Sequence, residues 1–148
     1  MKYLALTITA IGLMSCSLLD EDIQTSKVPS LVRNSFSQEF TNAIDVEWEK
    51  KKGNYEVDFE IKETDFSALF NPEGQLLKFK QDIQKEDLPD VVTTKIQENY
   101  PGHYIDDVDK LEIKGTVYYQ IDLDGKIIDR KAIYTADGHK DESVKYWD

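Results

Sequence analysis

Residues 55–61 read Tyr-Glu-Val-Asp-Phe-Glu-Ile, and residues 117–123 read Val-Tyr-Tyr-Gln-Ile-Asp-Leu. In both stretches apolar residues occur at every second position. A period of two indicates a strand with one buried and one solvated face, which is typical of antiparallel sheets. The turn sequences Lys52-Gly53-Asn54 and Lys114-Gly115 precede the two stretches, and Asp124-Gly125 follows the second. The two stretches therefore predict central strands of antiparallel sheets.

A helix that begins at a proline is predicted before each of these strands. Val28-Pro29-Ser30-Leu31-Val32 and Leu88-Pro89-Asp90-Val91-Val92 lie about sixty residues apart. We expect each proline in the first helical turn, where its missing N–H is tolerated. Apolar residues then follow at helical spacing and form one stripe on each helix. The stripes consist of Leu31, Val32, Phe36 and Phe40 in the first helix, and of Val91, Val92, Ile96 and Tyr100 in the second.

Further strands complete two similar units. In the first unit, residues 44–49 come before the central strand, and residues 66–70 and 75–80 come after it. In the second unit we expect strands within 106–113, 127–134 and 140–147. The predicted fold class is α+β, with two tandem repeats at 28–83 and 84–148, each a helix packed on one face of a roughly four-stranded antiparallel sheet. The expected core residues are Phe36, Phe40, Trp48, Phe59, Tyr100, Tyr119 and Ile121.

The N-terminus predicts export and lipid anchoring. Lys2 is followed by an apolar run that is shorter than the roughly 20 residues of a membrane-spanning helix, which is typical of a signal peptide. Leu13-Met14-Ser15-Cys16 resembles the lipobox of bacterial lipoproteins, which implies a signal peptide over 1–16 and lipidation of Cys16; a conventional signal peptide with a chance cysteine is the alternative. Residues 17–27 are predicted to be an acidic tether, or simply a solvated linker. The expected location is the outer membrane, on its periplasmic or its outer face.

The formal net charge of −11 restricts the partners that we expect. An acidic surface repels phosphate backbones, so nucleic acid is not an expected partner. No glycine-rich phosphate loop follows a strand, so nucleotides are not expected either. A basic protein or peptide would match the charge, although the acidity can also serve solubility alone. The expected membrane contact is the lipid anchor.

The sequence contains no recognisable catalytic arrangement. His103 and His139 stand next to glycine-containing turns, so we interpret both as turn residues rather than general bases. The acidic stretches 106–109 and 122–125 could supply oxygen ligands to calcium, but neither forms a complete twelve-residue loop. We therefore expect no metal, no cofactor and no enzymatic activity. A hydrolase that uses a pair of carboxylates is the less favoured alternative.

The proline-led helices, the Tyr-x-Val-x-Phe strand and the Phe-Asn-Pro-Glu-Gly turn at 70–74 together resemble the PepSY-like family. The resemblance covers roughly residues 28–147. It implies a tandem α/β repeat that is similar in fold to the β-lactamase-inhibitor protein and presents a sheet surface. Members of the family are mostly secreted or lipid-anchored. The resemblance transfers no inhibitory or catalytic residue to this sequence.

The leading functional hypothesis is a binding module that recognises a protein or peptide on its open sheet face. Tyr118 is the first candidate contact, because tyrosine combines contact area with a polar tip. A structural or envelope-stress lipoprotein without a ligand site is the alternative. The candidate binding residues are the polar members of the alternating strands: Glu47, Glu49, Glu56, Asp58, Glu60, Tyr118, Gln120 and Asp122.

Overall fold

The structure is a computed structural model that describes residues 21–148. Cys16, the signal peptide and the first residues of the expected tether lie outside the described residues. The elements follow one another as β1 (Glu21–Ile23), η1 (Thr25–Lys27), α1 (Ser30–Glu39), β2 (Ile44–Lys51), β3 (Asn54–Ile61), β4 (Thr64–Phe70), β5 (Leu76–Asp82), η2 (Lys85–Asp87), α2 (Asp90–Asn99), β6 (Tyr104–Ile113), β7 (Thr116–Asp124) and β8 (Arg130–Thr135). Neither described helix is long and apolar enough to cross a membrane.

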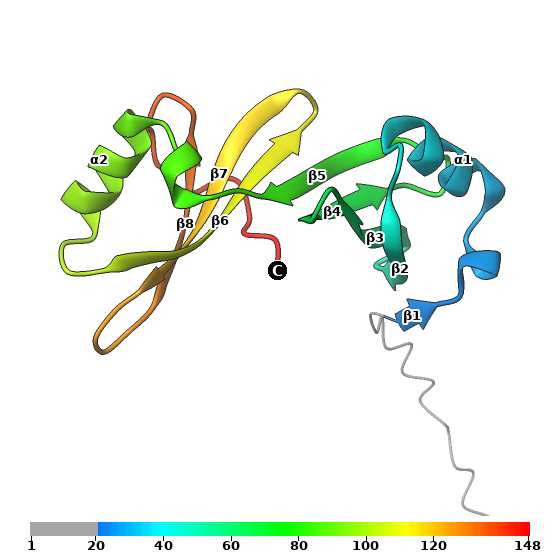
Figure 1. Cartoon of the computed structure of the whole chain (residues 1–148), viewed down its shortest axis with the longest axis horizontal. Coiled ribbons are helices and arrows are strands. Elements are labelled where there is room, and N and C mark those ends of the chain that lie inside the picture. The colour runs from blue at the N-terminus through cyan, green and yellow to red at the C-terminus, as the bar shows by residue number, and fades with distance from the viewer. Residues whose placement is uncertain (1–20) are drawn as a thin grey trace, which may run out of the picture.

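All eight strands form one antiparallel sheet in the order of the chain, from β1 to β8. The expectation of two four-stranded sheets is wrong in this respect, because β5 pairs with β6 from Lys78↔Ile113 to Asp82↔Asp109. That ladder satisfies the backbone groups at what would otherwise be two exposed edges. Figure 1 shows α1 and α2 at opposite ends of an elongated molecule, with β5 between the two halves.

The repeat is longer at its N-terminal side than the alternation predicts. Asp22-Ile23-Gln24 leads from β1 into η1, and Asp82-Ile83-Gln84 leads from β5 into η2. Each unit is therefore a strand, a short 3-10 turn, a helix and three further strands. Residues 21–27, which the sequence predicts to be part of the tether, belong to the first unit, since Asp22 pairs with Glu49 and Ile23 with Trp48.

Each helix covers its own end of the sheet. Phe36 of α1 lies edge-on to Trp48 and Phe59, with ring centroids 5.4 and 5.0 Å apart. In the second unit Val92 and Ile96 of α2 pack on buried residues of β6, β7 and β8. Four of the expected core residues, Phe36, Trp48, Phe59 and Ile121, are buried; Phe40, Tyr100 and Tyr119 pack against the core while partly exposed.

Both helices begin one residue later than expected, so Pro29 and Pro89 occupy the N-cap position instead of the first turn. Leu31 and Val91 are exposed, although both belong to the predicted stripes. They lie beside the turns at Gly74 and Gly138. A Cβ added to Gly74 would lie 3.0 Å from the Leu31 carbonyl oxygen, and one added to Gly138 would lie 2.8 Å from Val91 Cγ2. The same helix-to-turn contact thus occurs in both repeats.

The expected strand over 140–147 is absent from the structure. One bridge joins Lys140 to Tyr134, after which the chain leaves the edge of β8. The Asp141 carboxylate accepts hydrogen bonds from the main-chain N–H groups of Ser143 and Val144, which turns the chain away from a strand path. Residues 141–148, called the C-terminal segment below, then reach the middle of the sheet (Figure 1).

Candidate functional site

All eight candidate binding residues lie on the sheet face opposite the two helices, which we call the open face. The cross-strand pairs Glu47↔Asp58 and Glu49↔Glu56 place one group on β2 and β3. Tyr118, Gln120 and Asp122 form a second group on β7. Strands β4, β5 and β6 separate the two groups. The structure therefore places the predicted residues on a common face, but not in one cluster.

Two of the candidates are not open to a ligand, contrary to the expectation. Glu56 is 4% exposed and Gln120 is fully buried. The other candidates are exposed or half-buried. The C-terminal segment accounts for this burial, because Trp147 lies on the open face in contact with both side chains. Leu111 and Ile133, which share this face by register with Tyr118 and Gln120, are also buried.

Trp147 is held through its main chain and its indole. Its N–H donates to Gln120 Oε1 at 2.8 Å, and its carbonyl accepts from Gln120 Nε2 and Lys80 Nζ, both at 3.2 Å. The indole Nε1–H donates to Glu56 Oε2 at 2.9 Å, and Lys78 Nζ lies 3.8 Å from the ring centroid. We call these four residues, Glu56, Lys78, Lys80 and Gln120, the Trp seat.

Charge pairs support the seat from both sides. Lys51 Nζ lies 2.5 Å from Glu56 Oε1, and Lys80 Nζ lies 3.0 Å from Asp109 Oδ2. Burial opposes the charge of Lys51, but its hydrogen bonds and ion pairs with Glu56 and Glu49 raise its pKa overall. Burial, reinforced by Lys80 and Lys51, lowers the pKa of Lys78 to about 8, against the attraction of Glu56. Buried charges of this kind need partners, and the seat supplies them.

A row of carboxylates crosses the middle of the open face. Glu60 pairs with Asp65 between β3 and β4, and Asp82 pairs with Asp109 between β5 and β6. Burial and the charges of nearby carboxylates, Asp65 among them, raise the pKa of Asp82. We call Glu60, Asp65, Asp82 and Asp109 the acidic row. It spans the junction between the two repeats, and only Asp109 has a cationic partner among the described residues.

The acidic row borders a hollow of about 250 Å³, lined by Asp65, Phe66, Ser67, Lys80, Asp82, Asp107 and Asp109. Burial, and then the charges of Asp107, Asp109 and Asp65, raise the pKa of Asp82. Like charges opposite each other on neighbouring strands destabilise a sheet. The row therefore provides a strongly negative surface at the centre of the face.

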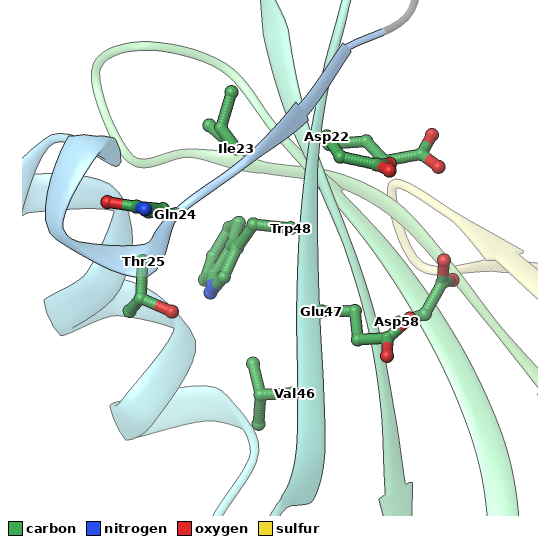
Figure 2. A pocket seen from close by; sticks show the side chains of 9 residues that line it. Asp22, Ile23, Gln24, Thr25, Val46, Glu47, Trp48 and Asp58 are labelled. Atoms are coloured by element: carbon green, nitrogen blue, oxygen red, sulfur yellow. The ribbon is translucent and has the colours of Figure 1, made fainter.

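A second hollow, of about 360 Å³, lies where β1 separates from β2. Figure 2 shows Asp22, Glu47 and Asp58 on one side of β2, and Ile23, Val46 and Trp48 on the other. An equivalent hollow of about 240 Å³ lies where the chain leaves β5, lined in part by Asp82, Ile83 and Gln84. Carboxylates thus recur at the same place in both repeats.

Sequence reasoning missed Lys78, Lys80, Asp65, Asp82 and Trp147 as members of this face. The alternation of Lys78, Lys80 and Asp82 within β5 was the available signal. The acidic stretches 106–109 and 122–125 contribute Asp107, Asp109 and Asp122 to the face. Among the residues that the structure describes, no group of three or more potential ligands is arranged to hold a metal ion.

Both histidines lie at turns or loops, as predicted. His139 is exposed and lies 3.0 Å from Asp137 Oδ2 within the same turn. His103 is half-buried, and its Nε2 lies 3.1 Å from the carbonyl oxygen of Ile128 in the loop between β7 and β8. Among the described residues, no side-chain hydrogen bond joins either histidine to a serine or cysteine. The contacts of both serve loop geometry.

Several solved structures share this fold. A DUF2874 family protein from Bacteroides uniformis is 17% identical, with a TM-score of 0.71, and the match covers 76% of this chain and 85% of that one. A DUF2874 family protein from Bacteroides ovatus is 21% identical, with a TM-score of 0.69 and coverages of 76% and 83%. A BLIP-like protein from Bacteroides fragilis is 20% identical, with a TM-score of 0.66 and coverages of 81% and 90%.

No curated protein matches the sequence. One family model does match, twice in succession, at residues 18–78 and 68–139. The two matches follow the two structural repeats and together cover most of the chain. Their family is described as beta-lactamase-inhibitor-like, PepSY-like. The sequence motifs, the repeated architecture and these matches agree, and the chain belongs to the PepSY-like family.

Proposed function

We propose that this protein is a binding module of the bacterial cell envelope that recognises a basic segment of a protein or peptide on its open face. The acidic row carries this proposal. Glu60, Asp65, Asp82 and Asp109 stand on four adjacent strands with one internal cation, Lys80, beside them. Lysine or arginine side chains of a ligand would supply the missing positive charge.

The negative charge of the acidic row is unbalanced. A sheet that serves only as a scaffold gains nothing from facing carboxylates, which repel one another across strands. Partial burial, and then this repulsion, raise the pKa of Asp82. The hollow beside Asp65 and Asp82 has room for the head of one basic side chain. Charge complementarity of this kind sets partner choice and the association rate.

Tyr118 and the carboxylates of β2 and β3 extend the proposed contact surface. Tyr118 is half-buried and pairs with Leu111, so its ring lies beside the centre of the face. Glu47 and Asp58 are exposed and form a cross-strand pair at the hollow of Figure 2. A ligand that runs across the strands along the acidic row would pass from Asp109 and Asp82 to Asp65 and Glu60, with Tyr118 and Asp58 in the neighbouring row of the same face.

The proposed location follows from Cys16. A lipidated cysteine followed by a short linker would hold the sheet close to a membrane surface, since each buried acyl CH₂ contributes about 0.8 kcal/mol. A structural relative from Bacteroides eggerthii, 15% identical, is proposed to be periplasmic. Replacing Cys16 by Ser and fractionating cells tests the anchor. We expect the protein to leave the membrane fraction, and an unchanged membrane pool would contradict lipidation.

Titration with fluorescein-labelled hexalysine, followed by anisotropy, tests the binding face. We expect binding that weakens with added salt and falls at least tenfold in Asp65→Asn/Asp82→Asn. The matched control is Glu39→Gln/Asp87→Asn, which removes the same charge from exposed positions of α1 and η2. Equal loss in both variants would reduce the effect to net charge and contradict a site on the open face.

A further inference from the structure

The Trp seat has the chemistry of a peptide-binding site. Gln120 is fully buried, and its amide both accepts from the Trp147 N–H and donates to the Trp147 carbonyl. Reading a main-chain N–H and C=O together, with a pocket for the side chain, is how extended peptides are recognised. Glu56 and Lys78 supply that pocket through the indole N–H and the ring face.

The seat is assembled from equivalent positions of the two repeats. Glu56 pairs with Glu49 and Leu69, and Gln120 pairs with Asp109 and Ile133, at the same points of β3 and β7. One equivalent residue therefore binds the indole and the other binds the main chain. Both stand on strands that are paired on either side, so main-chain ladders hold the backbone beneath these two side chains.

Trp147 itself is buried in the seat, but the rest of the C-terminal segment makes few main-chain bonds to the sheet. Beyond Lys140, the main-chain bond from the Asp141 N–H to the Ile133 carbonyl is the last one that the described C-terminal segment makes to a strand. Glu142, Ser143, Lys145 and Asp148 are exposed. A segment with few ladder bonds and few buried side chains opens at low free-energy cost. Opening of the segment breaks these few bonds together with the Trp147 contacts and the Lys131–Asp148 ion pair, and would free the seat for another tryptophan.

We propose that the Trp seat is a recognition site for a tryptophan residue in an extended segment of a partner protein, and that the C-terminal segment is its built-in occupant. The inference rests on the proposed function, because it names a second contact on the same open face. Asp109 connects the two sites, since it belongs to the acidic row and bonds to both Lys80 and Gln120. The fitting partner is thus an extended segment with a tryptophan and, nearby, basic side chains.

A competition experiment on the full chain tests this inference. The probe is a fluorescein-labelled peptide of residues 141–148, Asp-Glu-Ser-Val-Lys-Tyr-Trp-Asp, and the protein is wild type or Trp147→Ala. We expect the variant, with an empty seat, to bind the probe at least tenfold more tightly than wild type. A probe with Ala in place of Trp should not bind. Because this probe carries net negative charge, the acidic row cannot explain its binding.

Two further measurements make the outcomes separable. Adding Gln120→Leu to Trp147→Ala should abolish probe binding, while hexalysine binding by Trp147→Ala should persist. If Trp147→Ala binds the peptide probe but not hexalysine, the proposed function is contradicted while the inference on the Trp seat stands. If a folded Trp147→Ala protein does not bind the peptide probe, or binds the probes with Trp and with Ala equally, the Trp seat is not a tryptophan-recognition site. If neither Trp147→Ala nor Trp147→Phe gives a cooperative thermal transition, Trp147 is core structure and the inference fails.

Discussion

Asp82 is the residue at which the charge argument is most directly testable. It stands in the acidic row opposite Asp109, with Asp65 and Asp107 close by. At a separation of about 6 Å in a water-like dielectric, each like-charge pair costs about 0.7 kcal/mol. Lys80 offsets one of these repulsions through its ion pair with Asp109. Solvent screening of the half-exposed site leaves a net cost of about 1 kcal/mol at neutral pH.

Asp82→Asn should therefore stabilise the protein at pH 7 by about 1 kcal/mol, which corresponds to a rise in Tm of about 3 °C. The direction follows from linkage. Because burial and neighbouring charges raise the pKa of Asp82, the native state holds its proton at higher pH than the unfolded chain does. The contribution of Asp82 to the free energy of unfolding falls as the pH rises from the ordinary carboxyl pKa through the raised pKa of Asp82. The gain from Asn should accordingly vanish below about pH 4.

Urea denaturation of wild type and Asp82→Asn at pH 7 and at pH 3.5 measures both quantities. Asp22→Asn is the matched control, since Asp22-Ile23-Gln24 occupies the equivalent place in the first repeat and lies outside the acidic row. We expect its effect to be less than half as large. An Asp82→Asn protein that is less stable than wild type at pH 7, or equally affected at both pH values, would refute the repulsion argument.

Three other perturbations follow from packing and charge. Gly74→Ala should destabilise the protein by about 2 kcal/mol and Gly53→Ala by about 1 kcal/mol, as measured by urea titration. Both glycines have positive φ, but a Cβ added at Gly74 would come within 3.0 Å of Ser35 Oγ and the Leu31 carbonyl oxygen, whereas one added at Gly53 would meet nothing within 4 Å. Phe36→Ala should cost about 3–5 kcal/mol, since its ring contacts those of Trp48, Phe59 and Phe70; a loss below about 1 kcal/mol would contradict its central position. Burial lowers the pKa of Lys78 to about 8, so the native state releases this proton at lower pH than the unfolded chain does. The free energy of unfolding, measured by chemical denaturation relative to Lys78→Met, should therefore rise by up to about 1 kcal/mol between pH 8 and 10.5. A difference that falls over this range would contradict the lowered pKa.

Local signals were sufficient for most of the elements. The alternation of residues 55–61, bounded by Gly53 and the following turn, gives β3 within one residue at its start. The spacing of Val32 and Phe36, and of Val92 and Ile96, identifies the buried stripe of each helix. These features are predictable because side-chain period and turn chemistry are properties of short stretches.

The parts that sequence reasoning missed depend on contacts between distant residues. β1 has three residues, too few for any period to show, and it exists because β2 offers an edge. Glu56 resembles its exposed neighbour Asp58 in the sequence, yet it is buried because a tryptophan 91 positions later binds it. The fusion of the two predicted sheets likewise requires the register between β5 and β6, which no local pattern contains.

The difference between the side chains of Glu56 and Gln120 relates the sequence repeat to the peptide recognition that we propose. The two residues occupy equivalent positions, and an unmodified duplication would place the same side chain at both. An ionised glutamate only accepts hydrogen bonds, which suits the indole N–H, whereas a glutamine both donates and accepts, which suits a peptide main chain. A glutamate at 120 would lose the bond to the Trp147 carbonyl and would add a second buried carboxylate beside Asp109.

Gln120→Glu should therefore release Trp147 at neutral pH, while Gln120→Glu with Asp109→Asn should partly restore it, and tryptophan fluorescence would report both states. If Gln120→Glu kept Trp147 in place, the amide would not be what selects the segment on the open face.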